Sequence, residues 1–136
     1  MKSPLFVIIA VVCCLALLSD CKKKKGSDGC STEEPLQVTT TPAINSTEPP
    51  SPGSSFPLSV SITSALPVAG VTITIKARPE NSQTAFYNES RNSGTAINNF
   101  IITGTPVTTP AIVEITVTSS SCSTNRFTGS YRYSRK

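Results

Sequence analysis

The sequence contains no histidine and no tryptophan, and its only two aspartates are Asp20 and Asp28. Without histidine there can be no Ser-His-Asp triad and no histidine ligand for zinc. Without aspartate after residue 28, a calcium cage built from aspartates is not expected in the later part of the chain. These absences exclude most catalytic and metal chemistry, so we expect neither an enzyme nor a cofactor.

Carboxylates are also scarce where a folded domain is expected, because residues 56–136 contain only Glu80, Glu89 and Glu114. A glycosidase needs two carboxyl groups about 5 to 10 Å apart, and Glu80 and Glu89 are the pair that could approach each other. Exposed surface carboxylates are far commoner. The sequence has no Cys-x-x-Cys pair and no glycine-rich phosphate loop. We therefore expect a protein without catalytic activity.

The chain does contain an apolar run from Leu5 to Leu18, preceded by Lys2 and followed by Ser19 and Asp20. This order is typical of a secretory signal peptide, which we assign to residues 1–20. The 14 residues of the run would extend about 21 Å as a helix, whereas the hydrocarbon core of a bilayer is about 30 Å thick. The run is therefore too short to span a membrane.

The stretch LLSDCKKKK around Cys21 resembles the processing site of bacterial lipoproteins, especially those of the Bacteroidetes. The resemblance implies cleavage before Cys21 by signal peptidase II and fatty acyl chains, such as palmitate, on this cysteine. It implies a protein of the cell envelope, lipid-anchored to the outer membrane, because two or three acyl chains give stable anchoring. Asp20 departs from the Gly, Ala or Ser that is usual in this family. The alternative is an ordinary signal peptide, with Cys21 available for a disulfide.

Residues 21–55 follow the expected anchor and are rich in Pro, Ser, Thr and Gly. Lys22 to Lys25 would lie at the lipid headgroups or form a solvated spacer. Leu36, Val38 and Ile44 are the only large apolar residues, too few to offset the entropy lost on ordering. The composition predicts a flexible, extended stalk, of which residues 26–55 would reach at most about 90 Å.

From residue 56 onward, apolar and polar side chains alternate with a period of two, which predicts β-strands. In the segment 97–103 the inward face is left open, because Ile97 and Ile101 lie on one side and Phe100 and Ile102 on the other. The expected strands cover residues 58–62, 71–78, 83–89, 97–103, 112–118 and 127–134.

Six or seven short strands within about 80 residues predict an all-β fold, a small antiparallel two-sheet sandwich in residues 56–136. The architecture resembles the immunoglobulin and fibronectin type III sandwiches. The core tryptophan and the inter-sheet cysteine pair of antibody domains are absent. Because every alternating apolar face lies within residues 56–136, we expect this segment to fold alone.

Cys30 and Cys122 are the two cysteines left after the signal peptide and Cys21 are set aside. In an oxidising envelope they could form a disulfide. Such a bond would close a loop of about 92 residues and would add about 4 to 5 kcal/mol by chain entropy. The alternative is two independent exposed thiols, and the sequence leaves both open.

The C-terminal stretch RFTGSYRYSRK interleaves basic and aromatic residues, and residues 56–136 contain seven basic groups against three acidic ones. Such a pattern can indicate binding of nucleic acid or an acidic glycan. Alternation instead places Phe127, Tyr131 and Tyr133 in the core and the arginines in solvent, so we expect no nucleic-acid partner. We expect a non-catalytic, lipid-anchored module that contacts a protein or a glycan. The alternative is a secreted or surface carbohydrate-binding or adhesion module.

Overall fold

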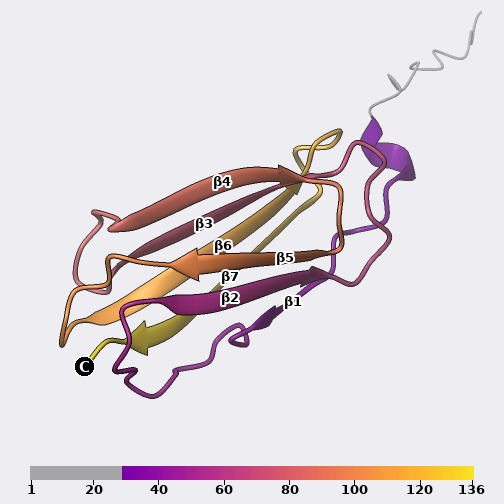
Figure 1. Cartoon of the computed structure of the whole chain (residues 1–136). Coiled ribbons are helices and arrows are strands. Elements are labelled where there is room, and N and C mark those ends of the chain that lie inside the picture. Colours follow the sequence, from indigo (N-terminus) through magenta and orange to yellow (C-terminus); the bar gives the residue numbers. More distant parts are fainter. Residues whose placement is uncertain (1–28) are drawn as a thin grey trace, which may run out of the picture.

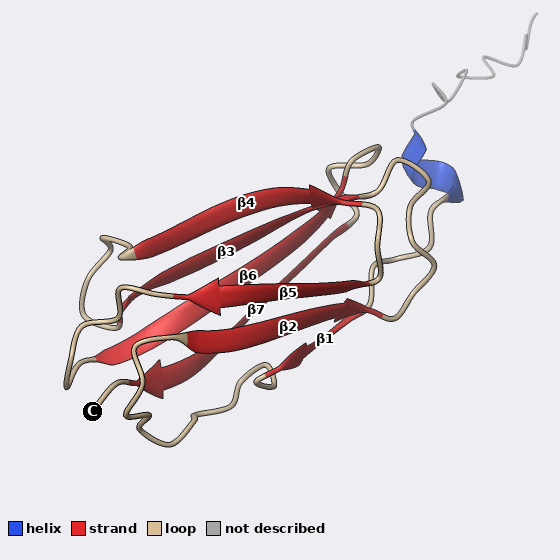
Figure 2. Cartoon of the chain, in the orientation of Figure 1, coloured by secondary structure: helices blue, strands red, loops and turns tan. Residues whose placement is uncertain are grey.

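Seven β-strands form two antiparallel sheets in the computed structural model, which describes residues 29–136 (Figures 1 and 2). The first sheet has the order β1-β2-β5 and the second the order β4-β3-β6-β7. This arrangement confirms the predicted all-β sandwich. The elements are η1 (Gly29–Thr32), β1 (Val38–Thr41), β2 (Phe56–Ile62), β3 (Val71–Pro79), β4 (Tyr87–Ser93), β5 (Ile97–Ile102), β6 (Pro110–Ser119) and β7 (Arg126–Ser134).

Strands β3 and β6 form the centre of the larger sheet. Their backbones pair over nine residues, from Val71 opposite Ser119 to Pro79 opposite Ala111. Every second residue of both strands is buried, as the period-two alternation predicts. These side chains pack across the sandwich against the inward residues of the smaller sheet. The fully buried aliphatic and aromatic core residues, each no more than 2% exposed, are Leu58, Val60, Val71, Ile73, Ile75, Ala77, Phe100, Ile102, Ala111, Val113, Ile115, Val117 and Tyr131.

The chain passes between the sheets three times, in the connections β2–β3, β4–β5 and β5–β6. In a constant-type immunoglobulin sandwich the fourth strand lies in the sheet that holds the first, second and fifth strands. Here β4 pairs with β3 along seven residues, so it belongs to the other sheet. The result is a division into three and four strands.

Strand β4 begins later than the sequence predicts. The expected strand at 83–89 was wrong, because residues 80–86 form the loop after β3 and β4 continues to Ser93. Asn92 and Ser93, which lie beyond the expected strand, pair with Thr72 and Val71. Their own strand preference is low, and the neighbouring β3 supplies the pairing that holds them extended.

Asn98, Phe100 and Ile102 form the inward face of β5. Phe100 and Ile102 are buried, whereas Ile97 is 65% exposed and Ile101 is 53% exposed. Asn98 also faces inward and is 7% exposed. Its Nδ2 donates a hydrogen bond to the carbonyl of Thr95 (2.9 Å), which satisfies the buried amide within its own turn.

The predicted stalk is wrong for the part that the structure describes, residues 29–55. Strand β1 pairs with β2, from Val38 opposite Ile62 to Thr41 opposite Ser59. Leu36 is 8% exposed and belongs to the core. The domain therefore begins well before residue 56, and the segment that we expected to be flexible completes the smaller sheet.

β1 ends at the cis Thr41–Pro42 peptide. From there the chain moves away from its partner strand β2 and runs along β7 of the larger sheet. Bridges join Thr47 to Arg132 and Ser51 to Arg135 in parallel orientation. Ile44 packs over Gly129, where an added Cβ would lie 2.7 Å from the Ile44 Cδ1 atom. The segment thus covers the outer edge of β7, which would otherwise expose unpaired backbone groups.

We predict that a chain starting at Ser54 is much less stable than one starting at Gly29. The shorter chain loses β1, Leu36 and the cover of the β7 edge, and it also lacks Cys30. Thermal melting followed by circular dichroism should show a cooperative transition for the longer chain and a broad or much lower one for the shorter chain. Equal melting temperatures would mean that residues 29–53 do not contribute to folding.

Tyr131 and Arg132 lie on opposite faces of β7 and offer a matched pair of substitutions. Tyr131 is 2% exposed, so Tyr131→Ala should cost about 3 to 5 kcal/mol of unfolding free energy. The Arg132 side chain is 54% exposed and pairs with Glu80, so Arg132→Ala should cost less than about 1 kcal/mol. Denaturant unfolding of both variants measures the difference, and similar losses would contradict the assigned faces.

Candidate functional site

The N-terminal segment enters the domain at one end of the sandwich, where it is covalently attached. A disulfide joins Cys30, in η1, to Cys122, in the loop between β6 and β7. Of the two possibilities that the sequence left open, the structure contains the bonded pair. The chain position nine residues after Cys21 is therefore fixed to the sandwich.

Glu33 reinforces this attachment with a hydrogen-bond network. Its Oε1 atom accepts hydrogen bonds from the hydroxyls of Ser119 (3.0 Å) and Ser121, and its Oε2 atom accepts one from Asn125 Nδ2 (2.9 Å). Asn125 Oδ1 in turn accepts a hydrogen bond from the backbone amide of Leu36 (2.9 Å). We call the disulfide and this network the N-terminal clamp.

The other residues that we assigned to membrane attachment lie outside the described residues. They are the signal peptide at 1–20, the lipidation candidate Cys21 and the lysines at 22–25. Within residues 29–136, no helix has the length and apolarity needed to cross a bilayer.

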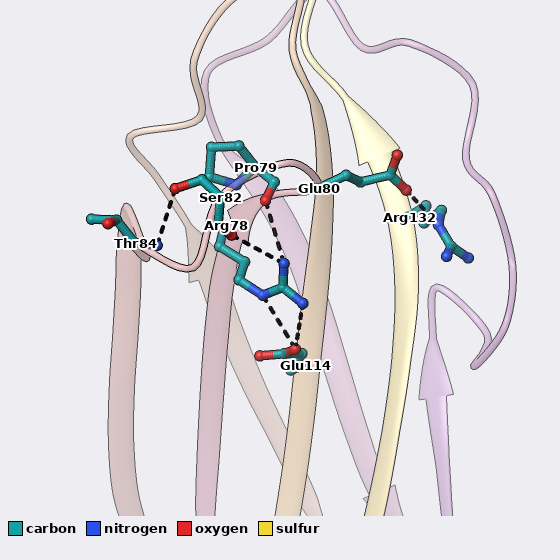
Figure 3. A network of polar contacts seen from close by, with 7 residues as sticks. All are labelled: Arg78, Pro79, Glu80, Ser82, Thr84, Glu114 and Arg132. Carbon is teal, nitrogen blue, oxygen red and sulfur yellow. Dashed lines mark hydrogen bonds and ion pairs between the residues drawn. The ribbon is translucent and has the colours of Figure 1, made fainter.

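The three carboxylates of residues 56–136 are each engaged by an arginine. Arg78 binds Glu114 through Nε (3.3 Å) and Nη2 (3.0 Å), and its Nη1 donates to the carbonyl of Ser82 (3.1 Å). Glu80 pairs with Arg132 (Figure 3). The two ion pairs lie side by side at the end of the larger sheet that is opposite the N-terminal clamp.

Glu89 lies apart from these pairs, in the middle of β4. It forms an ion pair with Arg91 (3.7 Å) and accepts a hydrogen bond from the hydroxyl of Tyr87. Partial burial and the bond to Glu89 raise the pKa of Tyr87 to about 12. Glu80 and Glu89, the pair considered for glycosidase chemistry, thus have different arginine partners and lie on different elements.

The outward faces of the two sheets differ in charge. The larger sheet presents rows of hydroxyl and amide side chains, such as Thr72 bonded to Asn92 (2.8 Å), together with its arginines and glutamates. The smaller sheet presents no charged residue in its three strands. Its outward residues are Thr39, Thr41, Pro57, Ser59, Ser61, Ile97, Asn99 and Ile101.

The uncharged face also contains a shallow hollow of about 460 Å³, in which Pro57 and Ile101 form part of the lining. Low charge together with exposed apolar side chains is typical of the centre of protein–protein interfaces. Beside it, Arg91 of β4 stacks over the ring of Phe100 (4.1 Å to the centroid) and donates to the carbonyl of Asn99 (2.8 Å). This contact joins the free edges of β4 and β5 and leaves the face itself open.

Comparison of the sequence with models of protein families and with curated proteins finds no match. Within residues 29–136, no group of three or more Cys, Asp or Glu side chains could hold a metal ion. The two-sheet β-sandwich is therefore what identifies the structural class of this protein.

The sequence reasoning missed Glu33, because it treated residues 21–55 as a stalk. Leu36 and Val38 carried a usable signal, since apolar residues two positions apart indicate one face of a strand. The partners of Glu33 carried none, because Ser121 and Asn125 are polar loop residues 88 and 92 positions away.

We predict that Glu33 makes the stability of the domain depend on pH. Hydrogen bonds from Ser121, Asn125 and Ser119 lower the pKa of Glu33 below its ordinary value of 4.5. A carboxylate with a lowered pKa stabilises the fold above about pH 5, and this contribution is lost as the pH falls through the folded-state pKa.

Glu33→Gln keeps the shape of the side chain but removes its charge, so the hydrogen bonds from Ser119, Ser121 and Asn125 lose their charge-assisted strength. The variant should therefore melt below the parent protein at about pH 6, and the difference should shrink toward about pH 3. Thermal melting across this range checks the expectation. A difference that stays constant with pH would show that the charge of Glu33 is unimportant.

Proposed function

We propose that this protein is a non-catalytic lipoprotein of the bacterial cell envelope, anchored at the outer membrane through acyl chains on Cys21. Its β-sandwich acts by contact with a partner protein. The observation that carries the proposal is the N-terminal clamp, because it attaches the chain to the sandwich nine residues after the expected lipid-bearing residue. A covalent attachment at this position suits a domain that is held by its N-terminus.

The clamp shortens the tether that the sequence alone suggested. Nine residue steps separate Cys21 from Cys30, which allows a span of at most about 30 Å. The clamped end of the sandwich would therefore lie close to the lipid surface. The C-terminus and the loops at 42–55, 80–86 and 103–109 lie at the opposite end, away from η1 (Figure 1), and would face outward.

A contact function agrees with the arrangement of charged groups. Each of the strand and loop carboxylates Glu80, Glu89 and Glu114 is engaged by an arginine, so these groups stabilise the fold and are not poised as a catalytic pair. The uncharged face of β1, β2 and β5 is the surface that best suits a partner protein. Its exposed side chains Ile97 and Ile101 would form the apolar centre of that contact.

The alternative, a carbohydrate-binding or adhesion module, would be favoured by exposed aromatic rings on one sheet. Every aromatic residue between 29 and 136 is buried or half-buried. No specific observation on this part of the chain therefore favours a glycan over a protein partner.

We predict that Cys21→Ala releases the protein from the membrane, because the acyl chains are its expected anchor. Cys14→Ala is the matched control, since it removes another cysteine from within the expected signal peptide. After detergent-phase separation of producing cells, the control should partition into detergent and the Cys21 variant into the aqueous phase. Mass spectrometry of the mature N-terminus identifies the acyl chains. Equal partitioning of both variants would contradict the lipid anchor.

A further inference from the structure

A second hollow lies at the end of the sandwich opposite the N-terminal clamp, between the segment before β2 and the end of β7. Its volume is about 200 Å³. Pro42 and the segment that follows it, the first residues of β2 and the last inward residues of β7 enclose it. The lining residues are Pro42, Glu48, Pro49, Ser51, Phe56, Pro57, Tyr131 and Tyr133.

Aromatic rings and prolines make up most of this lining. The rings of Phe56 and Tyr133 lie 4.1 Å apart between centroids, and those of Tyr131 and Tyr133 lie 6.1 Å apart. All three rings belong to the core and are held by packing. Proline side chains add rigid apolar surface. Such a wall attracts alkyl groups, and the faces of aromatic rings also attract cations.

Two polar groups of the hollow have unused binding capacity. The Tyr131 hydroxyl is buried and has no hydrogen-bond partner among the described residues, whereas the hydroxyl of Tyr133 is bonded to Thr105 (2.5 Å). Glu48 accepts a hydrogen bond from Ser46 (2.6 Å) but forms no ion pair with any residue of 29–136. Buried polar groups normally have partners, so the unpaired phenol of Tyr131 beside the half-buried carboxylate of Glu48 points to a polar ligand.

Neither Arg132 nor Arg135 forms an ion pair with Glu48. Arg132 is engaged by Glu80, and Arg135 donates to the carbonyl of Thr105. The pKa of the Tyr131 phenol is raised, first by burial, then by Tyr133 and then by the negative charge of Glu48. Glu48 therefore interacts electrostatically with Tyr131. The hollow is therefore mostly apolar, with one carboxylate that forms no ion pair among residues 29–136.

We propose that this hollow binds the alkylammonium group of a lysine side chain presented by a partner protein. The alkyl chain would lie against the aromatic and proline wall, the ammonium would pair with the Glu48 carboxylate, and the Tyr131 hydroxyl oxygen would accept one of its hydrogen bonds. The four carbons and one nitrogen of the side chain, at about 30 Å³ for each water-sized group, occupy about 150 Å³ and match the hollow in size. The site lies on the outward end of the domain and does not depend on the lipid anchor.

The test uses the purified mature protein and two small probes observed by NMR titration. Nα-acetyl-lysine methylamide carries the ammonium, and Nα-acetyl-norleucine methylamide has the same alkyl chain without it. The lysine probe should saturate with a Kd on the order of 1 to 10 mM, as expected for a few well-placed atoms. The shifted signals should belong to residues that line the hollow. Absence of saturable binding, or equal binding of the norleucine probe, would overturn the proposal.

Two conservative variants assign the roles of the polar groups. Glu48→Gln keeps the hydrogen bond from Ser46 but removes the charge, and it should weaken the lysine probe about tenfold. Tyr131→Phe removes a hydroxyl without a partner, so its melting temperature should not fall, while the probe should bind severalfold more weakly. Unchanged affinity in both variants would place the probe elsewhere.

Choline is the third probe, because it carries an alkylammonium group that belongs to lipid headgroups. Weaker binding of choline than of the lysine probe would support the assignment to a protein lysine, since a trimethylated nitrogen cannot donate to Tyr131 or Glu48. Tighter binding of choline would overturn it. Neither result bears on the anchor at Cys21, so the two proposals can fail separately.

Discussion

The pairing of β3 with β6 is the contact on which the rest of the structure depends. Nine residue pairs join the two strands, and their inward side chains form the larger half of the core. β4 and β7 extend the same sheet on either side, and the smaller sheet covers its inner face. Burial of the alternate aliphatic side chains places β3 and β6 at the centre of the larger sheet and leaves β4 and β7 at its edges. The exposed edge of β7 is then covered by the segment before β2.

The segment before β2 shows how one stretch of chain can serve both sheets. It supplies β1 to the smaller sheet, turns at Pro42 and then runs beside β7 in the larger one. The first part brings Glu33 and Cys30 to the loop after β6, and the second part brings Glu48 beside Tyr131. The N-terminal clamp at one end and the aromatic hollow at the other therefore both depend on residues of the segment 29–55, whose composition suggested a flexible stalk.

The glutamates illustrate how one type of side chain acquires different roles from its surroundings. Glu80, Glu89 and Glu114 each form an ion pair with an arginine, which lies on a neighbouring strand for Glu114, on the same strand for Glu89 and on β7 for Glu80. Glu33 is surrounded by neutral donors, which favour its ionised form. Glu48 has one hydroxyl partner and an apolar wall. Of these five side chains, Glu48 is the one that lies against aromatic rings and prolines without a cationic partner among residues 29–136, and this arrangement suits a cationic ligand.

The sequence by itself determined the all-β class and the inward faces of β2, β3, β6 and β7, because alternation along a strand reports directly which side is buried. It also identified Cys30 and Cys122 as a possible pair. Only the tertiary structure decided the extent of β4, the inward face of β5 and the place of residues 29–55 in the fold. These segments have weak local preferences, and a partner strand supplies the hydrogen bonds that order them. The proximity of Glu48 to Tyr131 could not be predicted from the sequence either. Contacts between residues far apart in the chain depend on how the sheets pack and leave no local sequence pattern.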